Sequence, residues 1–147
     1  MRLKNSAKAI LIHNGKLLVT TYKEGEEVYH LLPGGGQRIG ETLDNTLKRE
    51  CMEETGIEVK VNNLWFIREC FMEEEIHRVE FMYSCSLVSF TNLKLNDFNM
   101  DDNQTGVSWL KIEELLTHPL FPVGIRKRII ECYEGNFSSS IYLGEIH

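Results

Sequence analysis

Residues 34–57 read GGGQRIGETLDNTLKRECMEETGI, and this stretch decides the fold. Pro33 and the three glycines after it do not fit a regular element, so they predict a loop. A helix is predicted to follow over residues 42–55. Thr42 is suited to be its N-cap, and Gly56 stands where a left-handed residue would end it. The stretch is therefore expected to fold as a loop, a helix and a second loop.

The predicted helix carries three glutamates on the side that should face the protein. At about 100° per residue, Glu50, Glu53 and Glu54 lie beside the apolar stripe that is expected to pack on a sheet. The stripe comprises Leu43, Leu47 and Cys51. The three carboxylates repel one another, lie at the negative end of the helix dipole and lose hydration when buried. A divalent cation offsets all three costs, and carboxylate oxygens favour Mg²⁺ or Mn²⁺ over zinc. The alternative is a solvated, Glu-rich helix end in which Arg49 makes a surface salt bridge.

The glycines, the acids and the arginine also share a fixed spacing. Gly35 is followed after five residues by Glu41, and after seven more by RECMEETGI at residues 49–57. This pattern resembles the Nudix box, Gly-x5-Glu-x7-Arg-Glu-U-x-Glu-Glu-x-Gly-U, where U is a bulky aliphatic residue. Every fixed position matches over residues 35–57, and the one departure is Cys51 at the first U, where a free cysteine packs as a small hydrophobe. The resemblance implies an α+β fold, an α/β/α sandwich with a central mixed β-sheet and the box helix packed against it.

The resemblance also implies a chemistry, the Mg²⁺-dependent hydrolysis of a nucleoside diphosphate linked to another moiety. Metal ions would lower the pKa of the attacking water, and a carboxylate would take its proton. Carried over to this chain, the metal ligands are Glu50, Glu53, Glu54 and the backbone carbonyl of Gly34. Arg49 would orient the glutamates through its planar guanidinium. The supporting residues are Glu41 near the same site and Gly35 and Gly36, which allow a close backbone approach.

A long polar loop over residues 91–106 offers further acids for the role of general base. Residues 102–106, DNQTG, resemble the acidic-x-Gln-x-Gly stretch that carries an additional metal-ligating carboxylate in some nucleotide-cleaning members. Asp102 is therefore a catalytic candidate, with a solvated turn as the alternative. The other candidates for the base are the helix glutamates, Asp97, Asp101 and Glu80.

The rest of the chain alternates predicted strands with turns and ends with a second helix. Asn14-Gly15 between two β-rich runs predicts a hairpin. The strands are expected at residues 7–13, 16–22, 28–32, 57–61, 64–72, 79–90 and 107–110. A helical turn is expected at 112–116, a loop at 119–122 and an amphipathic helix at 123–133, whereas residues 135–147 carry no firm signal.

Composition limits the function classes. The chain has 147 residues, of which 42% are hydrophobic, and a net charge of −6, which is typical of one globular domain. The resemblance implies that this is a single Nudix hydrolase domain over residues 1–147. The acidic balance disfavours nucleic acid polymers and anionic membranes as partners. No apolar run is long enough to span a membrane, and the N-terminus lacks a signal-peptide pattern. Four scattered cysteines indicate reduced thiols in a cytoplasmic protein rather than disulfides or zinc.

Three hypotheses about the function stay open, two of them enzymes that differ in substrate. The first is an enzyme that cleaves a nucleoside diphosphate derivative such as ADP-ribose, a nucleotide sugar or a dinucleotide. The second is an enzyme that cleaves a nucleoside triphosphate to monophosphate and pyrophosphate, and the third is a non-catalytic binding module, which an intact box disfavours. Arg68 and Arg78 could meet phosphates, although cross-strand pairs with Glu69 and Glu80 are favoured. The aromatic candidates for base stacking are Tyr22, Trp65, Phe66, Phe71, Tyr83 and Phe121. Members of the resembled family that act on oxidised purines often read the base with an Asn in the loop before the last helix. That loop has no Asn here, at residues 118–122, which disfavours such a substrate. A homodimer is left open.

Overall fold

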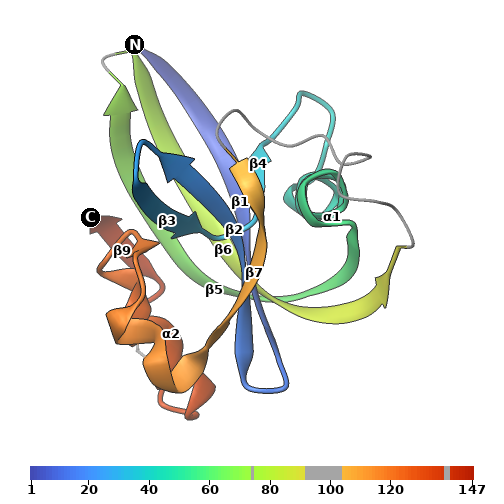
Figure 1. Cartoon of the computed structure of the whole chain (residues 1–147). Coiled ribbons are helices and arrows are strands. Elements are labelled where there is room, and N and C mark those ends of the chain that lie inside the picture. Colours follow the sequence, from blue (N-terminus) through green and yellow to red (C-terminus); the bar gives the residue numbers. More distant parts are fainter. Residues whose placement is uncertain (74, 92–103, 138–139) are drawn as a thin grey trace.

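A computed structural model describes residues 1–73, 75–91, 104–137 and 140–147 of the chain (Figure 1). Its strands are β1 (Arg2–His13), β2 (Lys16–Glu24), β3 (Glu27–Leu31), β4 (Gly34–Gly36), β5 (Ile57–Glu73), β6 (Ile76–Phe90), β7 (Gln104–Lys111), β8 (Leu120–Phe121) and β9 (Tyr142–Glu145). Its helices are α1 (Leu43–Thr55), the 3-10 helix η2 (Ile112–Thr117) and α2 (Ile125–Tyr133). Within these ranges no helix is long and apolar enough to cross a membrane.

The strands form one mixed sheet in the order β8-β3-β2-β1-β6-β5-β9. β1 runs parallel to β6 and antiparallel to β2, and β5 runs antiparallel to β6 and parallel to β9. β4 adds to β1, and β7 adds to β2. The sheet lies between α1 on one side and α2 on the other (Figure 1), which confirms the predicted α+β sandwich.

Alternation along β1 divides the core between the two helices. Ala7, Ala9 and Leu11 are fully buried in the cluster that also contains Leu47 and Cys51 of α1. Ile10 points the other way and belongs to the second cluster, with Met82 of β6 and Ile125 and Ile129 of α2. Successive side chains of a strand face opposite sides of a sheet, so one strand serves both layers.

The box helix has the predicted ends. The Thr42 side chain accepts a hydrogen bond from the Asn45 backbone N–H, and Gly56 adopts φ 70° and donates to the Met52 carbonyl. Helical spacing puts Thr55 on the side of the helix away from the apolar stripe, where it is predicted to be solvated, but the structure buries it. Its hydroxyl donates to the Cys51 carbonyl at 2.6 Å, so the last turn packs against the sheet without leaving a polar group unsatisfied.

The glycine run forms a strand, so the prediction of a loop there was wrong. Gly34, Gly35 and Gly36 pair antiparallel with Lys8, Ala7 and Ser6 of β1. Gly34 has a φ of 142°, and a Cβ added to it would lie 2.0 Å from the Ala7 carbonyl oxygen. Only glycine fits so close to the neighbouring backbone.

Other predicted bounds also differ from the structure. β5 is one long strand rather than two, and it crosses an irregularity between Val61 and Leu64 without breaking. β7 begins at Gln104, inside the predicted polar loop, because it pairs with β2 over its whole length. Within the tail that carried no signal, β9 pairs with β5.

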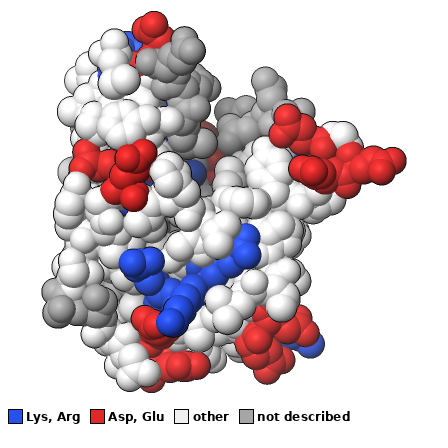
Figure 2. Space-filling model, turned by 90° about the vertical axis from the view of Figure 1, so that its left-hand side faces the viewer, with Lys and Arg blue, Asp and Glu red and all other residues white. Residues whose placement is uncertain are grey.

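Charged side chains are unevenly distributed over the surface. Figure 2 shows one face on which Lys and Arg gather in a band across the middle, with separate groups of Asp and Glu around it. All four cysteines are free and buried, as the composition predicted.

Candidate active site

Arg49 of α1 joins the acids of the predicted site. Its guanidinium meets Glu41 through two bonds, from Nε to Oε2 at 2.7 Å and from Nη2 to Oε1 at 2.9 Å. Nη1 donates to Glu50 at 2.8 Å and reaches Glu53 at 3.5 Å. Nη2 also donates to the Gly36 carbonyl at 3.1 Å. A planar fork with five donors can hold two carboxylates in fixed directions, which is the geometry expected of an orienting arginine.

Glu41 is held in its charged form. The hydrogen bonds from Arg49, followed by the one from the Arg38 backbone N–H, lower the pKa of Glu41 from 4.5 to about 2. Thr46 donates to the same carboxylate at 3.1 Å. The pKa of Arg49 is raised in turn, mainly by its bonds to Glu41. Glu41 and Arg49 therefore both stay charged near neutral pH.

Strand β4 lets the helix carboxylates reach into a cavity. The Gly34 N–H donates to Glu54 Oε2 at 3.1 Å, and Glu54 is only 3% exposed. A Cβ on Gly35 would lie 2.6 Å from the Glu50 carboxylate carbon. A Cβ on Gly36 would meet nothing within 4 Å, so that residue contributes through its carbonyl. Because β4 has no side chains, the Glu50 and Glu54 carboxylates of α1 can reach the space next to the strand.

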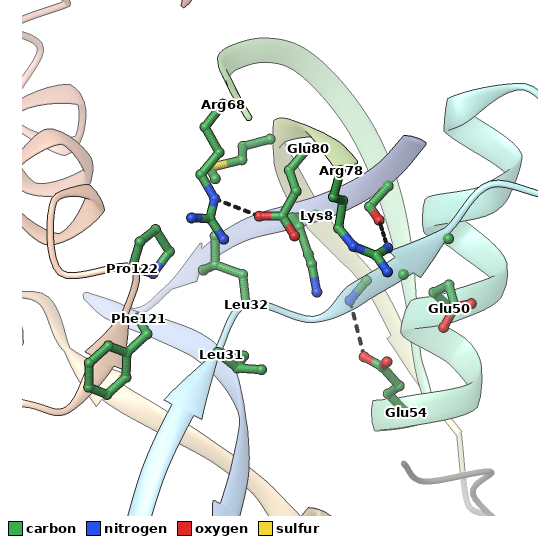
Figure 3. Close-up of a pocket in the computed structure, with 15 residues that line it drawn as sticks. Lys8, Leu31, Leu32, Glu50, Glu54, Arg68, Arg78, Glu80, Phe121 and Pro122 are labelled. Carbon is green, nitrogen blue, oxygen red and sulfur yellow. Dashed lines mark hydrogen bonds and ion pairs between the residues drawn. The ribbon is translucent and has the colours of Figure 1, made fainter. Parts of the chain in front are cut away.

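This space is a cavity of about 320 Å³, which falls in the range of small-molecule sites (Figure 3). Glu50 and Glu54 form one end of it together with β4. The neighbouring strands β1, β6 and β5 contribute Ser6, Lys8, Arg78, Glu80, Met82 and Arg68. The opposite end is apolar and is formed by Leu31, Leu32, Phe121 and Pro122.

Two arginines in the cavity have different partners. Arg68 Nε donates to Glu80 at 2.7 Å, both residues are buried, and Arg68 Nη1 donates to the Ile146 carbonyl at 2.9 Å. The predicted pairing of Arg68 with an acid of β6 is confirmed. The corresponding prediction for Arg78 was wrong, because Arg78 Nη1 donates to the Ser6 hydroxyl at 2.5 Å instead. Arg78 reaches Ser6 because β1 and β6 are direct neighbours in the sheet.

Glu69, the other predicted acid partner, belongs to a different cluster. It pairs with His77 at 2.7 Å and accepts a hydrogen bond from the Tyr142 hydroxyl. These bonds help to hold β9 against β5, and Glu69 does not line the cavity.

The box carboxylates suit a hard divalent cation in their chemistry. The donors are oxygens, and Gly35 leaves the Glu50 carboxylate room that a side chain would fill. Of the described residues, however, no three Asp, Glu, His or Cys side chains are grouped closely enough to hold a metal ion as they stand. Glu50 and Glu53 are bonded to Arg49, and Glu53 does not line the cavity. The structure thus brings Glu50 and Glu54 to one cavity and leaves Glu53 beside it.

Asp97, Asp101 and Asp102 lie outside the residues that the structure describes. The described end of that loop contacts the box helix, since Gln104 Nε2 donates to the Glu54 backbone carbonyl at 3.3 Å.

Of the aromatic candidates for base stacking, Phe121 lines the cavity. The other five do not line it: Tyr22, Trp65, Phe66, Phe71 and Tyr83. Tyr22 stacks on Tyr29, and Phe66 is part of the core.

Sequence reasoning missed Lys8 and Ser6 as site residues. They occupy alternate positions of β1, and Ala7 and Ala9 beside them face α1. Alternation indicates that Ser6 and Lys8 share one face of the strand, but Arg2 and Lys4 occupy the same face, so the sequence did not single these two residues out.

Known proteins resemble the chain in sequence pattern and in fold. The family model described as NUDIX domain matches residues 3–131. The chain belongs to this family. Its members are pyrophosphatase hydrolases that act on small nucleotides and generally use divalent metal ions, so the chain is assigned as an enzyme of this class. No curated protein matches the chain in sequence.

Solved structures of the NUDIX fold resemble the chain closely in shape. A NUDIX hydrolase from Nitrosomonas europaea has a TM-score of 0.74 at 21% identity, with 92% of this chain and 91% of that chain covered. A UDP-X diphosphatase has a TM-score of 0.71 at 18% identity, with 97% and 67% covered. An ADP-ribose pyrophosphatase from Streptococcus suis has a TM-score of 0.63 at 17% identity, with 98% of both chains covered. At these identities the likeness concerns the fold.

Proposed function

We propose that this NUDIX hydrolase cleaves the pyrophosphate bond of a nucleoside diphosphate derivative of the ADP-ribose, nucleotide sugar or dinucleotide type, with Mg²⁺ as its cofactor. The supporting observation is one cavity that has the carboxylates of Glu50 and Glu54 at one end and an apolar slot at the other. Such a shape suits a ligand with a charged middle and an apolar base. Two of the similar folds carry names of this substrate type, ADP-ribose pyrophosphatase and UDP-X diphosphatase.

The chain's own residues then have distinct tasks. Glu50, Glu53, Glu54 and the Gly34 carbonyl would hold the cation, and Arg49 with Glu41 fixes the direction of the helix carboxylates. When bound, Mg²⁺ neutralises phosphate charge and acidifies the attacking water. Asp102 would act as the general base, with the helix glutamates, Asp97, Asp101 and Glu80 as the alternatives. Residues 1–147 form one catalytic domain in this proposal. The four free thiols favour a cytoplasmic location.

A product analysis tests the proposal. The protein is incubated with ADP-ribose, a UDP-sugar, a dinucleoside polyphosphate and nucleoside triphosphates, each with Mg²⁺ or Mn²⁺. Nucleotide products are separated by ion exchange, and phosphate is measured with and without an added phosphatase. We expect two phosphomonoesters from the diphosphate derivatives, with free phosphate only after phosphatase treatment.

Two outcomes would change the conclusion. Release of pyrophosphate and a nucleoside monophosphate from the triphosphates alone would identify a triphosphate pyrophosphohydrolase instead. Free phosphate before phosphatase treatment would contradict both kinds of hydrolysis. Glu54→Gln should lower kcat at least about 10²-fold, and Glu26→Gln, at an exposed turn, is the matched control.

A further inference from the structure

The cavity contains two cationic side chains that form no ion pair with any acid of the described residues. Lys8 and Arg78 both line it, and both are partly buried. Among the described residues no carboxylate lies within 4.0 Å of either cationic group, whereas Arg68 in the same cavity is paired with Glu80. A partly desolvated cation without a partner is unfavourable unless an anion binds there.

The two cations converge although they start from distant positions. In the sheet, Lys8 is opposite Met82 and Arg78 is opposite Lys4, four pairs away. The Arg78 guanidinium nevertheless reaches back to the hydroxyl of Ser6, which is fully buried and lies two positions before Lys8 on the same face. Figure 3 shows the Lys8 amine and the Arg78 guanidinium directed into the same part of the cavity. A buried hydroxyl thus holds the Arg78 guanidinium in the cavity that Lys8 also lines.

Lys8 and Arg78 lie between the two ends of the cavity. Figure 3 shows Glu50 and Glu54 on one side of Lys8 and Arg78, and Phe121 and Pro122 on the other. A pyrophosphate has two phosphates in succession, and carboxylates alone repel both of them. A cation held by the glutamates would bring in the phosphate next to α1. The other phosphate needs positive charge from the protein, which has a net charge of −6.

We propose that Lys8 and Arg78 form an anion subsite that binds the substrate phosphate on the side of the apolar slot, so that the pyrophosphate spans from this subsite to the box glutamates. This inference rests on the proposed function and identifies the substrate class more closely. The ligand is a nucleotide whose base enters the slot of Leu31, Leu32 and Phe121 and whose chain carries at least two linked phosphates. Arg78 also lines a polar groove next to the cavity, which gives the second moiety a way out.

Binding without a divalent cation tests the subsite separately from catalysis. Calorimetry in EDTA measures the Kd of adenosine diphosphate for the wild type, Lys8→Gln, Arg78→Gln and the double variant. Hydrogen bonds to a charged group contribute about 1.5–3 kcal/mol, so each single variant should weaken binding about 10-fold or more. Adenosine, which has no phosphate, should bind all four proteins equally, and the salt dependence of diphosphate binding should be smallest in the double variant.

Matched variants separate a charge effect from a folding defect. Lys60→Gln and Arg2→Gln remove exposed cations outside the cavity and should leave the Kd unchanged. Lys8→Arg should retain binding within about 3-fold, and melting curves in EDTA identify any variant that does not fold. If Lys8→Gln fails to fold, Lys8→Met replaces it in the comparison.

Either of two results would contradict the proposal that Lys8 and Arg78 form an anion subsite. The first is a wild type that does not bind the diphosphate in EDTA. The second is folded Lys8→Gln and Arg78→Gln variants that bind it as the wild type does. Loss of binding in the variants together with no hydrolysis of any substrate in Mg²⁺ would support the subsite and contradict the proposed function.

Discussion

Gly35→Ala should damage the active site while sparing the fold. The added Cβ would lie 2.6 Å from the Glu50 carboxylate carbon and 2.8 Å from both of its oxygens. Ordinary contacts of this kind are 3.4–4 Å, so the carboxylate must move by roughly 0.8 Å or more. Gly35 does not adopt a left-handed φ, so alanine brings no backbone strain there. The carboxylate that moves is the one that Arg49 Nη1 holds at 2.8 Å.

The expected cost appears in turnover rather than in stability. A misplacement of about 1 Å in catalytic geometry can lower a rate about 10²-fold, and we expect a loss of that order in kcat with Mg²⁺. The assay is the product analysis at saturating substrate, with the melting temperature measured in EDTA. Gly36→Ala is the matched control, because its Cβ meets nothing within 4 Å and its carbonyl is retained. Wild-type kcat in a folded Gly35→Ala protein would refute the argument that Glu50 must occupy its present position.

Four further predictions concern the same site. Glu54→Gln should lower kcat at least about 10²-fold with no loss of melting temperature in EDTA, and Glu26→Gln should change neither; an active Glu54→Gln enzyme would contradict the metal assignment. Arg49→Lys should reduce kcat more than apparent metal affinity, because an ammonium cannot form the two parallel bonds to Glu41; unchanged turnover would leave Arg49 a surface partner. Folding lowers the pKa of Glu41 from 4.5 to about 2, so the charged carboxylate stabilises the folded protein above pH 4.5. This stabilisation is lost as the pH falls from 4.5 to about 2. The melting temperatures of the wild type and Glu41→Gln should therefore converge over that interval. Asp102→Asn should lower kcat and alter the acid limb of the pH–rate profile; a wild-type profile would exclude Asp102 as the sole base and leave Asp97, Asp101, Glu80 and the helix glutamates as candidates.

The box helix could be predicted from the sequence because its determinants are local. Thr42 and Gly56 cap it, and the eight-residue separation of Glu41 from Arg49 allows the two side chains to meet. Such signals need only neighbouring residues, so they survive without knowledge of the fold.

The cavity could not be predicted because it is assembled from distant strands. Lys8 and Arg68 each lie on a predicted strand, where alternation indicates which face each occupies, whereas Arg78 comes directly before the predicted strand at residues 79–90 and belongs to β6 in the structure. Their meeting depends on β1 lying beside β6 and β6 beside β5, which is a property of the topology. Arg68 is further held by the Ile146 carbonyl in a tail that gave no sequence signal at all.

Strand β4 explains why a glycine run precedes the box helix. Gly34 must be glycine because a Cβ there would lie only 2.0 Å from the Ala7 carbonyl oxygen of β1. Gly35 must be glycine for a different reason, the Glu50 carboxylate on the other side. The same three residues therefore extend the sheet through their backbone and leave a gap in its side-chain layer. Through that gap the acids of α1 reach the face on which β1 and β6 present Lys8 and Arg78, so that negative and positive groups from opposite layers of the sandwich share one cavity.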